Sequence, residues 1–108
     1  MELIRASEIR EDVRKVLLNT GVFMSAYQIL EELPASLRDQ LIAERGMPGQ
    51  GSGNPYASAS VVGDAARMLE GREIIYSMTR HLKFEVKGQD IKSGYGVCAF
   101  YRLNTGLA

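Results

Sequence analysis

The chain has 108 residues, of which 45% are hydrophobic and 24% charged, a composition typical of a globular domain and not of a disordered chain. Thirteen Lys and Arg residues balance thirteen Asp and Glu residues, which argues against a protein that binds nucleic acid mainly through strong electrostatic attraction. No apolar run approaches the ~20 residues needed to cross a bilayer, no signal segment is apparent, and the single cysteine cannot form an internal disulfide, so we expect one cytoplasmic domain over residues 1–108 with no membrane partner.

The first predicted helix runs from about Ser7 to Asn19. Apolar residues recur there at helical spacing, and charged residues occupy the remaining surface. The apolar stripe consists of Ile9, Val13, Val16 and Leu17. Val22 and Phe23 then form a short apolar patch, which we interpret either as a brief strand or as a plug in the core.

The second helix has the clearest start signal in the chain. Ser25 and Gln28 match the capping box, in which each side chain satisfies the free backbone amide of the other residue. Pro34 should end this helix at about Leu33, because a residue before proline is pushed out of the helical region. A third helical segment is expected over residues 36–45, with Gly46 as its stop and with its inward positions at Leu37, Leu41 and Ile42.

Residues 46–57 are predicted to form a glycine-rich loop. Four glycines and two prolines fall within this stretch, so regular structure would be entropically expensive. The run does not have the lysine of a phosphate-binding loop and follows a helix instead of a strand, so we interpret it as a flexible linker.

The segment from Ser58 to Leu69 is predicted to be a two-faced helix. The residues expected to point inward are Val61, Val62, Ala65, Ala66, Met68 and Leu69, and those expected to point outward are Ser60, Gly63, Asp64 and Arg67. Ser58 or Ser60 is a candidate N-cap, and Gly71 stands where a left-handed residue is expected after the helix.

The periodicity then changes to that of strands. Leu82, Phe84 and Val86 alternate with charged residues, which predicts a half-buried strand, followed by a turn region from Gly88 to Gly94 or Gly96. A second strand is expected from Tyr95 or Val97 to Leu103. Residues 74–76 form a further apolar run that fits a strand or a helical extension, and its β-branched and aromatic side chains favour the strand.

This order of elements resembles the winged-helix branch of the helix-turn-helix proteins. The segments that carry the resemblance are SAYQILEEL as the second helix, SASVVGDAARML as the recognition helix, and HLKFEVKG with YGVCAFYRL as the wing. The resemblance implies a small α+β domain of three to four helices followed by a C-terminal β-hairpin wing. The extra helix and glycine-rich loop between the second and recognition helices depart from that pattern.

The resemblance also implies that the chain binds double-stranded DNA, as a transcriptional regulator or as part of a DNA-associated system. Bases would be contacted by Ser58, Ser60, Asp64 and Arg67, and phosphates by Asn54, Tyr56, Lys83, Lys87 and Lys92. An arginine fork suits guanine, whereas Asp64 would repel the backbone unless it met a cytosine amine. Because the chain offers few cations, a monomer should bind weakly, and specific binding would need a homodimer.

A different class of function remains open. The balanced charge and Asp64 on the expected recognition face also fit a protein-interaction domain that keeps the scaffold without binding DNA. We expect no enzyme activity and no cofactor, because the chain shows no catalytic constellation and no metal-ligand spacing. His81 is interpreted as a surface or packing residue, Cys98 as a core residue, and Tyr95 either as a wing-tip contact or as a turn residue.

Overall fold

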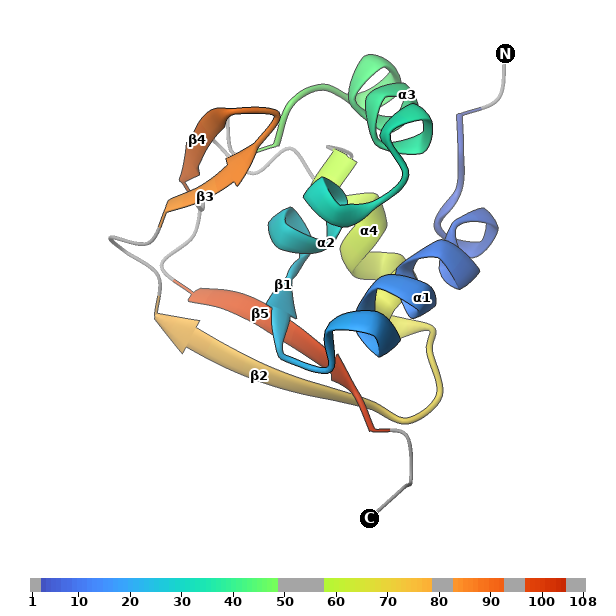
Figure 1. The fold of residues 1–108 in the computed structure, drawn as a ribbon, viewed down its shortest axis with the longest axis vertical. Coiled ribbons are helices and arrows are strands. Elements are labelled where there is room, and N and C mark those ends of the chain that lie inside the picture. The colour runs from blue at the N-terminus through green and yellow to red at the C-terminus, as the bar shows by residue number, and fades with distance from the viewer. Residues whose placement is uncertain (1–2, 49–57, 79–82, 93–96, 105–108) are drawn as a thin grey trace.

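Helices make up most of the first two thirds of the chain and strands most of the rest, giving an α+β fold (Figure 1). The computed structural model describes residues 3–48, 58–78, 83–92 and 97–104. The helices within these ranges are a 3-10 turn at Ala6–Glu8, α1 at Arg10–Thr20, α2 at Ala26–Glu32, α3 at Ala35–Arg45 and α4 at Ser58–Arg67. The strands are β1 at Met24–Ser25, β2 at Arg72–Met78, β3 at Lys83–Val86, β4 at Gln89–Lys92 and β5 at Val97–Leu103.

Three strands form an antiparallel sheet in the order β1-β5-β2. The β2–β5 ladder runs over seven residue pairs, from Arg72 opposite Leu103 to Met78 opposite Val97. The strand prediction for residues 74–76 is therefore confirmed. The described parts of the two segments that were expected to pair as the wing, β3 and β5, do not pair with each other, because β5 lies between β1 and β2 and β3 pairs with β4.

Strands β3 and β4 form a separate hairpin. Its turn is Lys87-Gly88, where both residues have positive φ angles of 52° and 76°. This two-residue conformation matches the right-handed twist of paired strands, so the chain reverses at once. The long turn predicted from Gly88 onward is wrong over residues 89–92, which form β4. The alternation of Phe84 and Val86 is confirmed, because both side chains are buried and their neighbours Lys83 and Glu85 are exposed.

The core lies between the sheet and the helices that cover one of its faces (Figure 1). Tyr101 and Leu103 of β5 point from the sheet into this core. The predicted apolar stripe is buried at all four positions, of which Val13, Val16 and Leu17 lie in α1 and Ile9 directly precedes it. Residue Ile9, with φ −106° and ψ 6°, separates the 3-10 turn from α1, so the first predicted helix is divided in two.

Helix α2 begins and ends where the sequence predicts. The Gln28 amide donates to Ser25 Oγ at 3.3 Å, and the Ser25 amide donates to Gln28 Oε1 at 2.9 Å, which confirms the capping box. Leu33 is extended before Pro34, as proline requires. Val22 is 57% exposed and precedes β1, so residues 22–23 form neither the expected strand nor a core plug.

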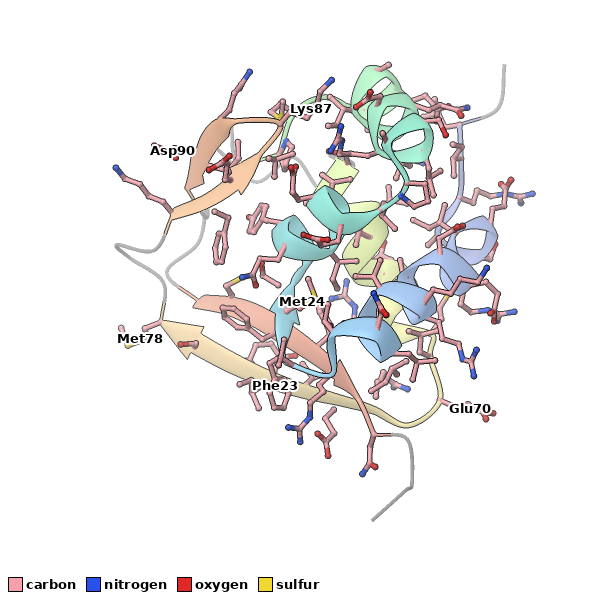
Figure 2. All side chains as sticks on the ribbon, in the orientation of Figure 1. Phe23, Met24, Glu70, Met78, Lys87 and Asp90 are labelled. Atoms are coloured by element: carbon pink, nitrogen blue, oxygen red, sulfur yellow. The ribbon has the colours of Figure 1, made fainter. Side chains whose placement is uncertain are left out.

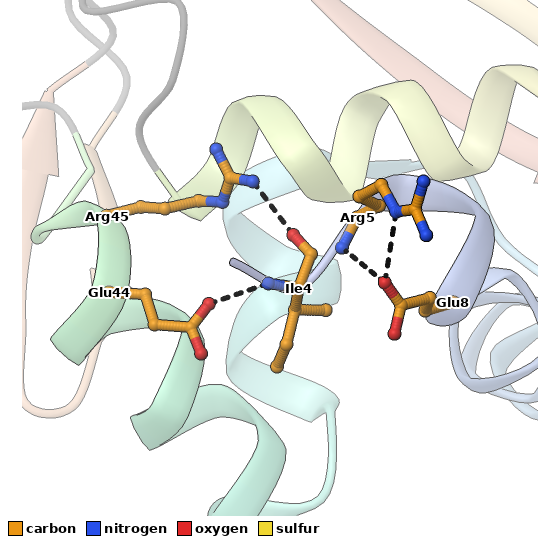
Figure 3. A network of polar contacts seen from close by, with 5 residues as sticks. All are labelled: Ile4, Arg5, Glu8, Glu44 and Arg45. Atoms are coloured by element: carbon orange, nitrogen blue, oxygen red, sulfur yellow. Dashed lines mark hydrogen bonds and ion pairs between the residues drawn. The ribbon is translucent and has the colours of Figure 1, made fainter. Parts of the chain in front are cut away.

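The N-terminal segment is attached to the end of α3 (Figure 3). The Ile4 amide donates to Glu44 Oε1 at 2.8 Å, and Arg45 Nη2 donates to the Ile4 carbonyl at 2.8 Å. Arg5 turns the other way, toward Glu8. Two neighbouring side chains of α3 thus hold both backbone groups of one residue that lies about forty positions away.

Within the described ranges, the helices are all too short or too polar to cross a membrane.

Candidate functional site

Helix α4 lies against the other helices and leaves a narrow exposed face. Seven of its ten residues are buried, and among them Val61, Val62, Ala65 and Ala66 confirm the predicted inward set. Two expectations for this helix are wrong: Met68 is 46% exposed, and Gly63 is buried. The residues that reach solvent are Ser60 in part, and Asp64 and Arg67.

Arg67 is held in place by a neighbour on its own helix and by one from the sheet. Its Nη1 donates to the Tyr101 hydroxyl at 2.6 Å, and its Nη2 donates to Asp64 Oδ1 at 2.5 Å. The Arg67 side chain is 49% exposed and that of Asp64 is 55% exposed. We call Asp64, Arg67 and Tyr101 the Arg67 cluster. One edge of the guanidinium is thus fixed by the protein while about half of the side chain faces solvent.

Gly63 leaves room for this cluster. A Cβ atom at position 63 would lie 3.4 Å from the Tyr101 hydroxyl oxygen and 3.7 Å from Arg67 Nη1. The first distance is at the lower limit of an ordinary contact, so a methyl group would touch the hydroxyl and the space for longer side chains is limited. The small residue therefore allows the sheet residue to reach the helix arginine.

The charge states in the cluster follow from burial and from the contacts. Burial raises the pKa of the Tyr101 hydroxyl, and the adjacent arginine offsets this only in part, so the phenol stays protonated. Burial acts to lower the pKa of Arg67, but the interactions with Tyr101 and the Asp64 carboxylate outweigh it and raise this pKa on balance. Arg67 is thus a permanent cation beside a neutral phenol and an anion.

Ser58 does not lie on the exposed face, which corrects its assignment as a base contact. Its side chain is fully buried, and its Oγ donates to the Gly46 carbonyl at 2.8 Å. The serine therefore joins the start of α4 to the end of α3. It is the first residue of α4, inside the helix and not at the cap position.

The β3–β4 hairpin, which carries the predicted phosphate-binding lysines, folds back over α2. Phe84 stacks on Tyr27 of α2, with ring centroids 5.2 Å apart. At the hairpin turn, which Figure 2 labels at Lys87, the Lys87 amide donates to Glu31 Oε2 at 2.8 Å. Its ammonium group lies 3.1 Å from Asp39 Oδ1. Lys87 is therefore engaged with the helices, while Lys83 is exposed.

Several predicted residues lie outside what the structure describes. Asn54 and Tyr56 belong to residues 49–57, and the side chain of Lys92 is likewise not described although its backbone is part of β4. His81 and Tyr95 also fall in undescribed ranges. Cys98 is buried, as expected of a core residue, and burial raises the pKa of its thiol.

The sequence reasoning missed Tyr101 as a member of the site. It lies thirty-four positions from Arg67, and only the β1-β5-β2 strand order brings its hydroxyl to α4. The exposed apolar side chains of β2 were also missed, because the pattern there showed a strand but not that the strand lies at an edge. In the described part of the chain, groups of three or more potential metal ligands do not occur. Searches of protein-family models, curated proteins and solved structures found no match to this chain.

Proposed function

We propose that this chain is a DNA-binding module that contacts double-stranded DNA through the exposed face of α4, with Arg67 as the base-contacting residue. The observation that carries the proposal is the fixed and half-exposed guanidinium of Arg67. A guanidinium has five N–H donors, and the two bonds to Tyr101 and Asp64 use two of them. A fork whose orientation is already set loses less entropy when it binds the two acceptors of guanine.

The order of the elements supports this proposal. A capped helix, a second amphipathic helix with a polar outer face, and an antiparallel strand pair follow one another, as the winged-helix resemblance implies. Helix α3, which lies between α2 and α4 in the chain, departs from the winged-helix order of elements, as the sequence already indicated. This extra helix lengthens the connection from α2 to α4 but leaves Asp64 and Arg67 of α4 exposed to solvent.

The charges predict weak binding by a single copy. Arg67 is paired with Asp64, and Lys87 is paired with Asp39, so two of the proposed cationic contacts already have anionic partners. Affinity for DNA of arbitrary sequence depends on released counterions, and it should lie at the weak end of the usual range, at about 10⁻⁴ M. Sequence preference should then depend on Arg67.

The test measures the fluorescence anisotropy of a labelled duplex at about 50 mM and about 200 mM salt, first with random sequence and then with a sequence selected from it. Arg67→Ala should weaken binding of the selected duplex by about 1–3 kcal/mol. The matched control is Arg14→Ala on α1, because Arg14 is also half exposed, at 51%, and also pairs with an acid three positions away. The control variant should bind like the unchanged protein.

Two results would contradict the proposal. Absence of any affinity for random duplex at low salt, where phosphate attraction is largest, removes DNA as the ligand. Equal losses in the Arg67 and Arg14 variants would show a general effect of positive charge and would remove Arg67 from the site.

A second candidate function is protein interaction on the same scaffold, and a separate observation favours it. Strand β2 exposes large apolar side chains, with Tyr76 and Met78 each 71% exposed. Exposed apolar groups gathered on one element are typical of a surface that meets another protein. A chain that shows no affinity for duplex at low salt but associates through β2 would have this function alone.

A further inference from the structure

We propose that two copies of this chain associate by pairing their β2 strands edge to edge. In the described part of the chain, β2 pairs with β5 on one side only, because it is the last strand in the order β1-β5-β2. Every second residue of this seven-residue strand therefore directs its backbone N–H and C=O groups away from β5, where another strand can pair with them. This inference concerns the protein-interaction surface and holds whether or not α4 binds DNA.

The side chains of β2 do not protect this edge. Natural edge strands are usually shielded by lysines, prolines, bulges or short length. Here the charged residues Arg72 and Glu73 stand at the start of the strand, and Glu73 is paired with Arg102 of β5. The other half carries Ile75, which is 46% exposed, in addition to Tyr76 and Met78. Figure 2 labels Met78 at the far end of this strand.

The strand is complementary to itself in one register. Two identical strands that pair in antiparallel fashion are related by a two-fold axis perpendicular to the sheet. If the axis passes through Ile75, all seven residues of β2 find a partner, and Ile75 lies opposite Ile75 of the second copy. On the opposite face of the sheet, the pairs are Ile74 with Tyr76 and Arg72 with Met78, while Glu73 faces Ser77 on the same face as Ile75.

Paired length favours this register over its neighbours, and charge excludes the registers centred on the charged start of the strand. With the axis at Ile75 no two like charges face each other, and the aliphatic part of Arg72 covers Met78. With the axis at Glu73, two carboxylates would lie directly opposite each other, which is destabilising. Moving the axis to either neighbour of Ile75 shortens the paired stretch. The second copy is therefore the occupant that matches both the apolar groups and the charges of this edge.

The size of the contact predicts a weak dimer. One seven-residue strand with three exposed apolar side chains offers an interface near or below roughly 1,200 Å², the lower limit of standard protein interfaces. We therefore expect dissociation constants in the micromolar range or weaker. The association should be visible at high protein concentration and absent at nanomolar concentration.

The test is a charge exchange at position 75, with molecular mass measured by sedimentation equilibrium over a range of protein concentrations. In the proposed dimer, residue 75 of one copy lies opposite residue 75 of the other. Ile75→Lys alone and Ile75→Glu alone should therefore each place two like charges opposite each other and weaken the dimer at least tenfold. An equal mixture of the two variants should recover the dimer, since opposite charges then meet at the axis. The control is Val22→Lys, which changes an exposed apolar residue outside β2 and should leave the dimer unchanged.

Circular dichroism of each variant verifies folding, which an exposed position should preserve. A monomeric mass for the unchanged protein at millimolar concentration overturns the proposal, and so does a mixture that stays monomeric or a Val22 variant that dissociates equally. A segment of another protein that pairs with this edge while the chain itself stays monomeric would also overturn it. The DNA proposal is judged separately by the duplex titration, so either can fail while the other stands.

Discussion

At the scale of single residues, two glycines with nearly the same φ angle have different surroundings. Gly71 and Gly88 have φ angles of 73° and 76°, a region that costs other residues about 1–2 kcal/mol. A Cβ on Gly71 would meet the Asn104 carbonyl oxygen at 2.8 Å, whereas a Cβ on Gly88 would meet no described atom within 4 Å. Gly71 also accepts a hydrogen bond from the Asn104 amide at 2.7 Å, which joins the start of β2 to the end of β5.

We therefore expect Gly71→Ala to destabilise the fold by about 2–4 kcal/mol, because backbone strain and a clash with a backbone atom add together. Gly88→Ala should cost only the backbone strain, about 1–2 kcal/mol. Urea denaturation of both variants measures the difference. Equal costs would show that the contact with Asn104 relaxes without penalty.

At the scale of elements, helix α2 depends on the reciprocal bonds between Ser25 and Gln28. Ser25 is fully buried and also belongs to β1, so a water molecule cannot take over the hydrogen bond that its hydroxyl accepts from the Gln28 amide. We expect Ser25→Ala to lower the free energy of unfolding by about 1–2 kcal/mol. Ser36→Ala, at an exposed position in the first turn of α3, is the control and should have little effect. Thermal unfolding of both variants tests the role of the cap, and similar midpoints would contradict it.

At the scale of the whole molecule, charges join the hairpin to the helices across a long stretch of chain. Hydrogen bonds from Lys87 and then from Arg38 lower the pKa of the Asp39 carboxylate below its ordinary value. A lowered folded pKa means that the unfolded chain takes up the proton first as pH falls. The ionised Asp39 carboxylate therefore contributes its full share to the stability of the fold above about pH 4, the ordinary carboxylate pKa. This contribution is lost as pH falls through the pKa of the folded state.

Asp39→Asn should therefore be less stable than the unchanged protein at pH 7, and the two should converge at a pH below the folded pKa. Added salt should reduce the difference at pH 7, because both groups are partly exposed. Urea midpoints at several pH values provide the measurement. A difference that persists in strong acid would mean that the asparagine acts by packing and not by charge.

The dimer would also affect the arrangement of the two candidate sites. A two-fold axis perpendicular to the sheet keeps the same faces of both sheets on one side. Arg67 contacts Tyr101, which points to the helix-covered face, so both copies would present α4 on the same side of a six-stranded sheet. Two α4 helices on one side could contact one duplex together, which would compensate for the weak binding of each.

Local patterns in the sequence were enough to predict most of the elements. The capping box, Pro34 and the apolar stripe of α1 each act within a few residues of one another, so the sequence alone indicates their helices. The inward side of α4 and the alternation of Phe84 and Val86 follow from the periods of helix and strand in the same way. Of the proposed site, this reasoning found Arg67 and Asp64, which stand three positions apart on one helix.

Strand pairing and its consequences were decided only by the tertiary structure. The sequence indicates strands but not which edges meet, so it could not reveal that β3 turns back onto β4 or that β5 lies between β1 and β2. The contact of Tyr101 with Arg67, the burial of Ser58 and the place of β2 as the outermost strand of the described sheet all follow from that arrangement. The physical reason is that helical and strand periodicity reflect neighbours within a few residues, whereas pairing depends on which distant surfaces bury each other best.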